Sequence, residues 1–176
     1  VVRGTFSMLK DTTMKTFFQW VPPYEFGQFH QTDHNFTITG IKGCHIEILF
    51  RALDRPDHIG KLLSLELTGA WINEARETPW SVIEAIQGRV GRYPSKAEGG
   101  PSWWGVFMDT NPPDTDSAWY KYFEEDGWRK GADKVGISET MAEVFRQPSG
   151  LSDQAENLDN LPGGQDYYRR LAVGKA

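Results

Sequence analysis

Disulfide chemistry is excluded first, because this chain of 176 residues has a single cysteine, Cys44. One thiol cannot form an intramolecular disulfide, so small secreted domains held by disulfides are ruled out, and the composition fits a reducing compartment. No run of about 18 apolar residues occurs, so the sequence predicts no transmembrane helix. Residues 1–5 have neither the charged n-region nor the apolar h-region of a signal peptide. What is present is enough chain for one globular domain with its own hydrophobic core.

Positive charge is in short supply, since 24 Asp and Glu exceed 19 Lys and Arg and give a net charge of -5. This balance excludes a protein whose whole surface binds nucleic acid, although a local basic patch is compatible with it. Residues 85–97 fit such a patch, because they contain Arg89, Arg92 and Lys96 and no acid. The three side chains suit the phosphates of DNA, a neighbouring subunit or an ordinary solvated loop, and the sequence leaves these alternatives open.

No metal-binding pattern is found among the histidines and the cysteine. The four histidines match no zinc signature in their spacing. Cys44 and His45 are neighbours in an expected strand, so their side chains point to opposite faces. We therefore expect no metal ion bound directly by these residues.

Short apolar runs alternate with helical patterns along the chain, which is typical of an α/β domain. Two of the runs, residues 70–72 and 103–108, predict buried strands of a largely parallel sheet. An N-cap at residues 11–13 is expected to start the first of the flanking helices. The helices are expected at residues 14–21, 80–87, 114–125 and 165–173.

An antiparallel hairpin is expected in addition to the parallel sheet. Residues 36–40 and 44–50 alternate in the manner of strands, and residues 40–43 predict the turn between them. The stretches on either side of the hairpin, residues 24–35 and 51–60, contain many polar residues and are expected to be loops.

Tryptophan is abundant, with seven in the chain. Most are expected in the core, because they lie in apolar strands or at helical spacing with another aromatic ring. Trp80 and Trp128 border loops and are expected nearer the surface.

Polar residues follow both predicted strands of the parallel sheet. Asn73 and Glu74 follow the first strand, and Asn111 lies shortly after the second. Ligands of open α/β sheets bind outside the carboxyl ends of strands. A Glu at such a place can orient a water beside a phosphate, and an Asn on the next strand can bond the same phosphate. The alternative is structural: Glu74 would cap the next turn, and Asn111 would be a turn residue before two prolines.

Two arginines, Arg51 and Arg55, flank the expected loop before the Glu74 strand. Either one is a candidate arginine finger, which would stabilise charge on a phosphoryl group. The alternative is that both are solvated loop residues.

These residues together resemble motifs of tailed-phage large terminase subunits. Residues 67–77, LTGAWINEARE, resemble the Walker B region of that family, and residues 88–94, GRVGRYP, follow it as they do there. Residues 109–113, DTNPP, resemble its coupling motif. Residues 1–13 resemble the strand and helix after the P-loop helix, and segments within residues 145–168 are similar to the end of the ATPase region. The order and spacing of the motifs over nearly the whole chain carry the resemblance.

The resemblance implies an ATP-driven motor that packages viral DNA into procapsids. Glu74 would be the catalytic glutamate that polarises water, and Asn111 would link the state of the γ-phosphate to domain movement. Asn73 would stand where the family usually has the Walker B Asp, which helps to hold Mg²⁺ through water. The implied cofactors are ATP and Mg²⁺. The implied partners are double-stranded DNA, the portal protein, the small terminase subunit and other motor subunits, in the cytoplasm of a bacterial host and with no membrane.

The chain departs from the family pattern in what it lacks. No G-x-x-x-x-G-K-[ST] motif occurs, and residues 88–96 do not supply one because no Lys-Ser or Lys-Thr pair follows the glycines. No later cluster of acids indicates the two-metal site of a nuclease domain. We therefore expect residues 1–176 to be a partial ATPase domain, incomplete at its N-terminus, with a core over residues 1–145 and an extended segment with a short helix over residues 146–176.

These departures lead to expectations about the activity and the surface of the chain, and two alternative functions stay open. The chain by itself is expected to bind nucleotide weakly and to hydrolyse little ATP, and a sheet edge or apolar patch is expected to lie exposed. One alternative is a DNA- or portal-binding module that hydrolyses nothing. A weaker alternative is a small-ligand or carbohydrate binder that uses an exposed groove lined by tryptophan.

Overall fold

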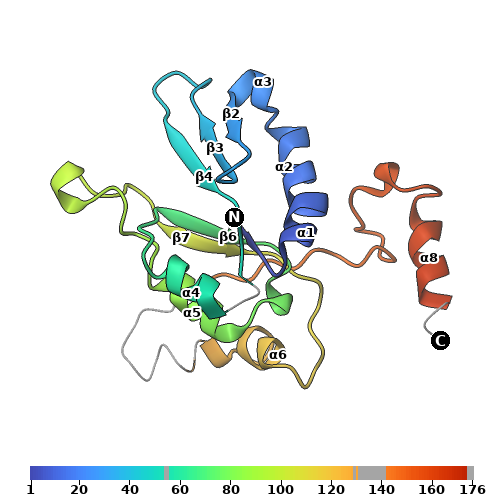
Figure 1. Ribbon diagram of the computed structural model, residues 1–176. Coiled ribbons are helices and arrows are strands. Elements are labelled where there is room, and N and C mark those ends of the chain that lie inside the picture. The colour runs from blue at the N-terminus through green and yellow to red at the C-terminus, as the bar shows by residue number, and fades with distance from the viewer. Residues whose placement is uncertain (54–55, 129, 131–141, 174–176) are drawn as a thin grey trace. The chain divides into compact units, whose positions relative to one another are not determined.

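A computed structural model describes residues 1–53, 56–128, 130 and 142–173 (Figure 1). The chain divides into two compact units, Val1–Tyr120 and Lys121–Ala176, and each is described by itself. Among the described residues, none of the helices is both long enough and apolar enough to cross a membrane.

A four-stranded parallel sheet forms the centre of the first unit, with the strand order β5-β1-β6-β7 (Figure 1). Its register places Val2 opposite Ile72, and Ile72 opposite Met108. The carboxyl ends of β1, β6 and β7 therefore meet at one edge of the sheet. The strands are β1 (Val2–Arg3), β5 (Arg51–Ala52), β6 (Gly69–Ile72) and β7 (Gly105–Met108).

A separate three-stranded antiparallel sheet has the order β2-β3-β4. The predicted hairpin is confirmed as β3 (Asn35–Ile38) and β4 (Ile46–Leu49). The prediction of a loop before it was wrong, because β2 (Gly27–His30) lies there. In β2 the half-buried positions are Gly27 and Phe29 and the exposed ones are polar, so its period of two contains a single large apolar residue.

One helical segment runs from Phe6 to Trp20 and begins earlier than predicted. It comprises α1 (Phe6–Met8), the π-helical stretch η1 (Leu9–Met14) and α2 (Lys15–Trp20). The N-cap is Thr5, whose hydroxyl accepts the Met8 N–H at 3.3 Å, so the N-cap expected at residues 11–13 was wrong. Those residues lie inside the helix, where the Thr12 hydroxyl donates to the Met8 carbonyl at 2.7 Å. A short helix, α3 (Pro23–Phe26), follows.

The helical segment and the antiparallel sheet share a hydrophobic core. Phenylalanine rings dominate it and meet mainly edge to face, as aromatic pairs prefer. The Phe17 and Phe50 ring centroids lie 5.4 Å apart, and those of Phe18 and Phe36 lie 5.3 Å apart. The buried residues of this core are Leu9, Met14, Phe36, Ile38 and Phe50.

Two helices of the first unit, α4 (Pro56–Leu62) and α5 (Trp80–Gln87), pack against each other. The bounds of α5 are as predicted, and its Val82, Ile83 and Ile86 are fully buried. The loop expected at residues 51–60 was wrong, because β5 and α4 lie there. Pro56 is the first residue of α4, a place where its missing N–H leaves no helical hydrogen bond unmade.

Helix α6 (Ala118–Phe123) is shorter than expected, and the boundary between the units falls inside it. In the second unit, η5 (Leu158–Asn160) precedes α8 (Gln165–Val173), whose bounds match the prediction. The Tyr168 ring packs directly on Gly150, where a Cβ atom would overlap it.

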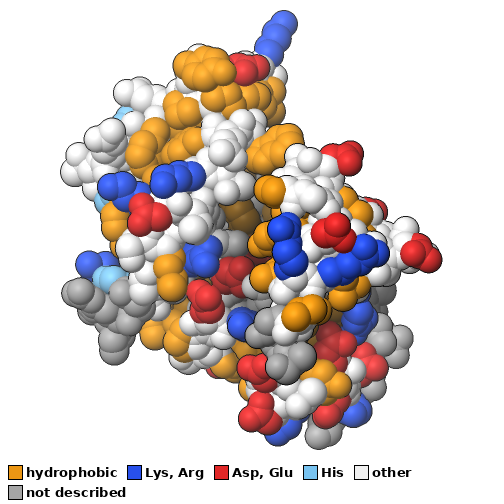
Figure 2. All heavy atoms as spheres, turned by 90° about the vertical axis from the view of Figure 1, so that its right-hand side faces the viewer, with side chains coloured by type: hydrophobic (Ala, Val, Ile, Leu, Met, Phe, Trp, Pro, Cys, Tyr) orange, Lys and Arg blue, Asp and Glu red, His pale blue; other side chains and the backbone are white. Residues whose placement is uncertain are grey.

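The burial of three tryptophans differs from the sequence prediction, whereas Trp119 is buried as expected. Trp128 was expected near the surface and is 5% exposed, whereas Trp103 and Trp104 were expected in the core and are 50% and 59% exposed. The strand predicted at residues 103–108 begins only at Gly105, so Trp103 and Trp104 precede β7 and are not held in the sheet. Hydrophobic side chains also gather at the top of Figure 2, in the region of α2 and α3.

Candidate functional site

The carboxyl ends of β1, β6 and β7 bring polar side chains together. Arg3 ends β1, Asn73 and Glu74 follow β6, and Asp109 and Asn111 follow β7. Hydrogen bonds connect all five residues, which we call the strand-end cluster. The structure thus joins the three predicted site residues of this region and adds two that sequence reasoning did not single out.

Asn73 is the centre of the strand-end cluster. Its Oδ1 accepts hydrogen bonds from Arg3 Nη1 at 2.8 Å and from Thr13 Oγ1 at 2.6 Å. Its Nδ2 donates to Oδ1 and Oδ2 of Asp109 at 2.9 and 2.7 Å. Donors therefore face the amide oxygen and an acceptor faces the amide nitrogen, which fixes the orientation of the amide.

Glu74 adopts an uncommon backbone conformation. Its φ of 51° and ψ of 54° are left-handed, which costs a non-glycine residue conformational energy. It is the N-cap of the turn η2 (Ala75–Glu77), yet its carboxylate makes no capping hydrogen bond. The carboxylate instead accepts from Asn111 Nδ2, at 3.3 Å to each oxygen. Glu74 therefore occupies the N-cap position that the structural alternative predicted, but its side chain does not cap the turn.

Arg3 closes the other end of the strand-end cluster. Its side chain is 13% exposed, and besides Asn73 it bonds Thr12 Oγ1 at 2.8 Å and lies 3.8 Å from a Glu77 carboxylate oxygen. The local sequence gives no signal for this role, because Asn73 is 70 residues away from Arg3. Asp109 carries a signal: it follows β7 as Asn73 follows β6, so strand pairing alone places the two side by side.

The candidate arginine fingers are not part of the strand-end cluster. Arg51 is half-buried, and its guanidinium donates to the carbonyls of Asp33 and Phe50, both at 2.9 Å, and to Asn35 Oδ1 at 2.9 Å. Burial lowers the pKa of Arg51, although the nearby carboxylates of Glu47 and Asp33 oppose this. The guanidinium would have to leave these partners to reach a phosphate, and its role stays a prediction. Arg55 lies outside the described residues.

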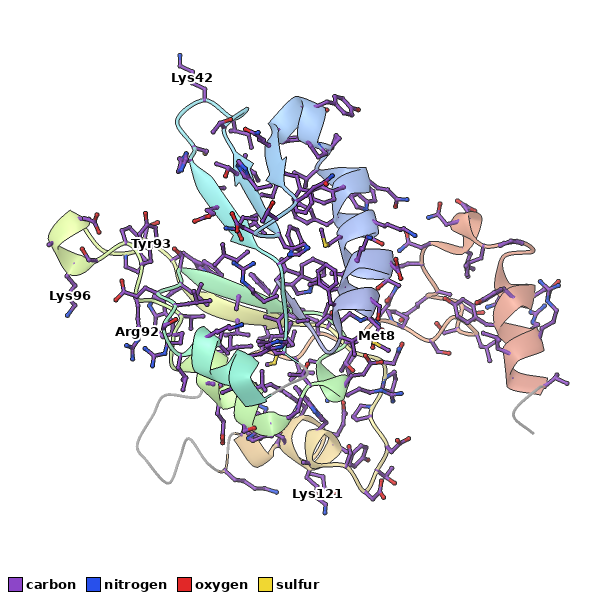
Figure 3. The ribbon with its side chains drawn as sticks, in the orientation of Figure 1. Met8, Lys42, Arg92, Tyr93, Lys96 and Lys121 are labelled. Atoms are coloured by element: carbon purple, nitrogen blue, oxygen red, sulfur yellow. The ribbon has the colours of Figure 1, made fainter. Side chains whose placement is uncertain are left out.

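The predicted basic residues lie between α5 and β7, on residues 88–104, which we call the projecting loop. Arg92 and Lys96 are exposed and point away from the sheet in Figure 3, and Arg89 is half-buried. The loop contains the turn η3 (Lys96–Glu98), closed by a capping box in which Ser95 Oγ donates to a Glu98 carboxylate oxygen at 2.7 Å. This hydrogen bond and the Ser95 N–H lower the pKa of Glu98. Arg92 and Lys96 also line a shallow cavity of about 610 Å³ with Trp104.

The strand-end cluster contains two carboxylates, those of Glu74 and Asp109. Across the described part of the chain, no three His, Cys, Asp or Glu side chains converge on a possible metal position. Mg²⁺ bound with substrate phosphates keeps several waters and uses one or two protein carboxylates. Glu74 and Asp109 are the side chains of the cluster that could serve such an ion.

Known proteins match this chain through structure and not through sequence. No protein-family model and no curated protein sequence matches it. The large terminase of a thermophilic bacteriophage, in its crystal form 2, matches with a TM-score of 0.59 and 15% identity over 80% of this chain and 34% of that one. The complex of that terminase with ATP-γ-S matches with a TM-score of 0.50 and 16% identity, over 78% of this chain and 32% of that one. Its complex with ADP matches with a TM-score of 0.50 and 18% identity, over 80% of this chain and 34% of that one.

The comparison establishes the fold. The chain spans about a third of the length of the thermophilic phage terminase chains. Its parallel sheet with flanking helices and a separate antiparallel sheet has the fold of part of a phage large terminase, which confirms the predicted α/β class. At identities of 15–18%, the matches support a shared fold and nothing more specific.

Proposed function

We propose that this chain is part of the ATPase domain of a phage DNA-packaging motor, with Glu74 as the carboxylate that orients the attacking water. One observation carries the proposal: Asn111 Nδ2 bonds the Glu74 carboxylate at the adjacent ends of β6 and β7. It gains weight from the fold shared with a large terminase that has been crystallised with ATP-γ-S and with ADP. The proposal includes the partners and the cytoplasmic location implied by the resemblance, with residues 1–145 as the folded core.

The chemistry follows from the two side chains. A carboxylate has about four acceptor positions, and Glu74 uses its oxygens for a long, 3.3 Å contact with Asn111. It therefore has capacity to accept a hydrogen bond from water and to hold that water for attack on the γ-phosphate. The Asn111 amide donates equally well to a phosphate oxygen, so it changes partner with the state of the nucleotide. Mg²⁺, when bound with ATP, neutralises charge on the phosphates.

The role of Glu74 is tested by measuring the rate of ATP hydrolysis, in the protein in which residues 1–176 occur. Glu74→Gln keeps the shape of the side chain and removes the charge, so kcat is expected to fall by roughly 100-fold or more. The matched control is Glu156→Gln, because Glu156 is an exposed carboxylate of the other unit. The control is expected to keep wild-type turnover. Wild-type turnover in Glu74→Gln contradicts the proposal. Residues 1–176 alone contain no Walker A motif and are expected to hydrolyse little ATP.

The alternative function is a DNA-binding module that hydrolyses nothing. The observation that favours it is the projecting loop, where the Arg92 and Lys96 side chains are exposed and point away from the sheet. Affinity for duplex DNA, measured over a range of salt concentrations, is expected to fall in the Arg92→Ala, Lys96→Ala double variant. The slope of log affinity against log salt is expected to decrease by about one for each phosphate that the protein no longer neutralises. Lys42→Ala is the control, since Lys42 lies on the hairpin turn. DNA binding without any nucleotide binding would select this alternative.

A further inference from the structure

We propose that Asp109 is a positioning residue for Glu74 and that it acts as the acid of an acid–amide pair with Asn73. The inference rests on the proposed function for the role of Glu74. The arrangement of the side chains themselves does not depend on it.

The register of β6 and β7 places residues 73 and 109 next to each other. Ile72 pairs with Met108, so the next residues, Asn73 and Asp109, leave the sheet side by side. Both oxygens of the Asp109 carboxylate accept from Asn73 Nδ2, at 2.9 and 2.7 Å. Of these two neighbouring strand-end positions, the one on β7 therefore carries the acid and the one on β6 carries the amide.

Asp109 is joined to the segment around Glu74 by several hydrogen bonds. Its N–H donates to the Ile72 carbonyl at 3.2 Å, and its carbonyl accepts from the Ala75 N–H at 2.9 Å. Its side chain accepts from the Glu74 N–H at 3.2 Å. These bonds bracket Glu74, whose left-handed backbone persists only where its surroundings hold it. The direction of the Glu74 carboxylate thus depends on Asp109.

The neighbours of residue 73 account for the asparagine at that position. Arg3 lies on one side of residue 73 and donates to it, whereas Asp109 lies on the other side and accepts from it. An amide meets both demands, because it has an acceptor atom and a donor atom. A carboxylate at residue 73 has no donor for Asp109 and would place two like charges in contact. Positions 73 and 109 therefore accommodate one acid and one amide between them.

A charge exchange tests this coupling without nucleotide. Asn73→Asp alone is expected to lower the Tm by about 5 °C, because two carboxylates then face each other. The double variant Asn73→Asp, Asp109→Asn restores an acid and an amide, and it is expected to regain at least half of that loss. Asn160→Asp makes the same chemical change on the surface of the other unit and is expected to leave the Tm unchanged. A double variant whose Tm change equals the sum of the two single changes overturns the proposal.

Two further readouts separate positioning from simple stabilisation. The Glu74 amide proton is expected to shift upfield in Asp109→Asn, because its acceptor loses a full charge. In the protein in which residues 1–176 occur, Asp109→Asn is expected to lower kcat with little change in KM, and the double variant is expected to recover part of kcat. An unmoved Glu74 amide overturns the positioning role. Tm coupling together with wild-type hydrolysis in Glu74→Gln contradicts the proposed function and leaves the coupling intact.

Discussion

At the scale of the residue, Thr13 shows how the strand-end cluster depends on a side chain distant in sequence. Its hydroxyl donates to Asn73 at 2.6 Å, and the residue is 4% exposed. Thr13 lies in the helical segment, whereas Asn73 follows β6. This bond therefore fixes the helix against the carboxyl edge of the sheet.

Thr13→Val is expected to destabilise the fold by about 1 kcal/mol. Valine has nearly the same shape, so the change removes the hydrogen bond and leaves Arg3 as the remaining donor to Asn73 Oδ1. Chemical denaturation monitored by fluorescence measures the difference. Thr16→Val on the exposed side of α2 is the control and is expected to have no comparable effect. Equal stability of the two variants would show that the Thr13 bond contributes nothing.

Whether a residue of the site could be predicted depends on how its contacts arise from the sequence. Glu74 and Asn111 were foreseeable, because each lies at or near the end of an apolar strand and parallel strands bring such ends together. Arg3 and Thr13 were not, because their contacts with Asn73 depend on how β1 and the helix meet the sheet. The left-handed conformation of Glu74 has no local sequence signal either, since glycine or asparagine is the usual residue there.

At the scale of the element, the projecting loop contains one turn, η3, that is closed by a capping box between Ser95 and Glu98. Ser95 and Glu98 bond each other's backbone and side chain in the capping box of η3. The lowered pKa of Glu98 means that the folded loop favours the ionised carboxylate. Its contribution is present above the ordinary glutamate pKa of about 4.3 and is lost as the pH falls through the lowered pKa.

Ser95→Ala is expected to loosen this loop and to leave the rest of the fold unchanged. Without the hydroxyl, the N-terminal N–H groups of the turn lose a partner and open more often to solvent. Hydrogen exchange at neutral pH is expected to be faster at Glu98 and Gly99, with no change in α5. Ser81→Ala, on the exposed face of α5, is the comparison. Unchanged exchange at Glu98 would contradict the role of the capping box.

Elements were predictable where their ends carry strong signals. Helix α5 lies between Pro79 and Gly88, which delimit a helix well, and its bounds matched. Strand β2 and helix α4 were not predicted, each for its own reason. The first has few large apolar residues, and the proline that opens the second also signals a loop. A proline at the first turn and a proline in a loop look alike until the following residues are seen to pack.

At the scale of the whole molecule, β7 is an end strand of the parallel sheet. It pairs with β6 alone within the described residues, and its Phe107 is 64% exposed. The Phe107 ring stacks on that of Trp103, with centroids 5.5 Å apart. An apolar strand edge of this kind favours association with another strand.

The isolated chain is therefore expected to self-associate through β7, and Phe107→Lys is expected to reduce this. A lysine on an edge strand opposes pairing with a second edge because its charge would have to be buried. Light scattering over a range of protein concentrations measures the apparent mass. Tyr24→Lys, at a residue that is 90% exposed on α3, is the control for a general effect of added charge. A mass that falls equally in both variants would exclude β7 as the contact.

The fold was recoverable from the sequence although few residues match the thermophilic phage terminase. Identity with its structures is 15–18%. The shared feature at this level is the fold, which the alternation of apolar strands and helical patterns in this sequence predicted. The burial of Trp128 and the exposure of Trp103 were not predicted, because burial depends on tertiary packing that local apolar patterns do not reveal.

The helical segment from Phe6 to Trp20 has a mechanical consequence. Its middle bonds the strand-end cluster through Thr12 and Thr13, and its buried side chains are embedded in the core of the antiparallel sheet. A helix of this length extends for roughly 20 Å. A tilt of about 5° about the middle of such a rod displaces each end by about 1 Å. Because the hydroxyl of Thr13 bonds Asn73 and the neighbouring Met14 packs in the core with Phe36 of the hairpin, one rigid helix joins the strand-end cluster to the antiparallel sheet.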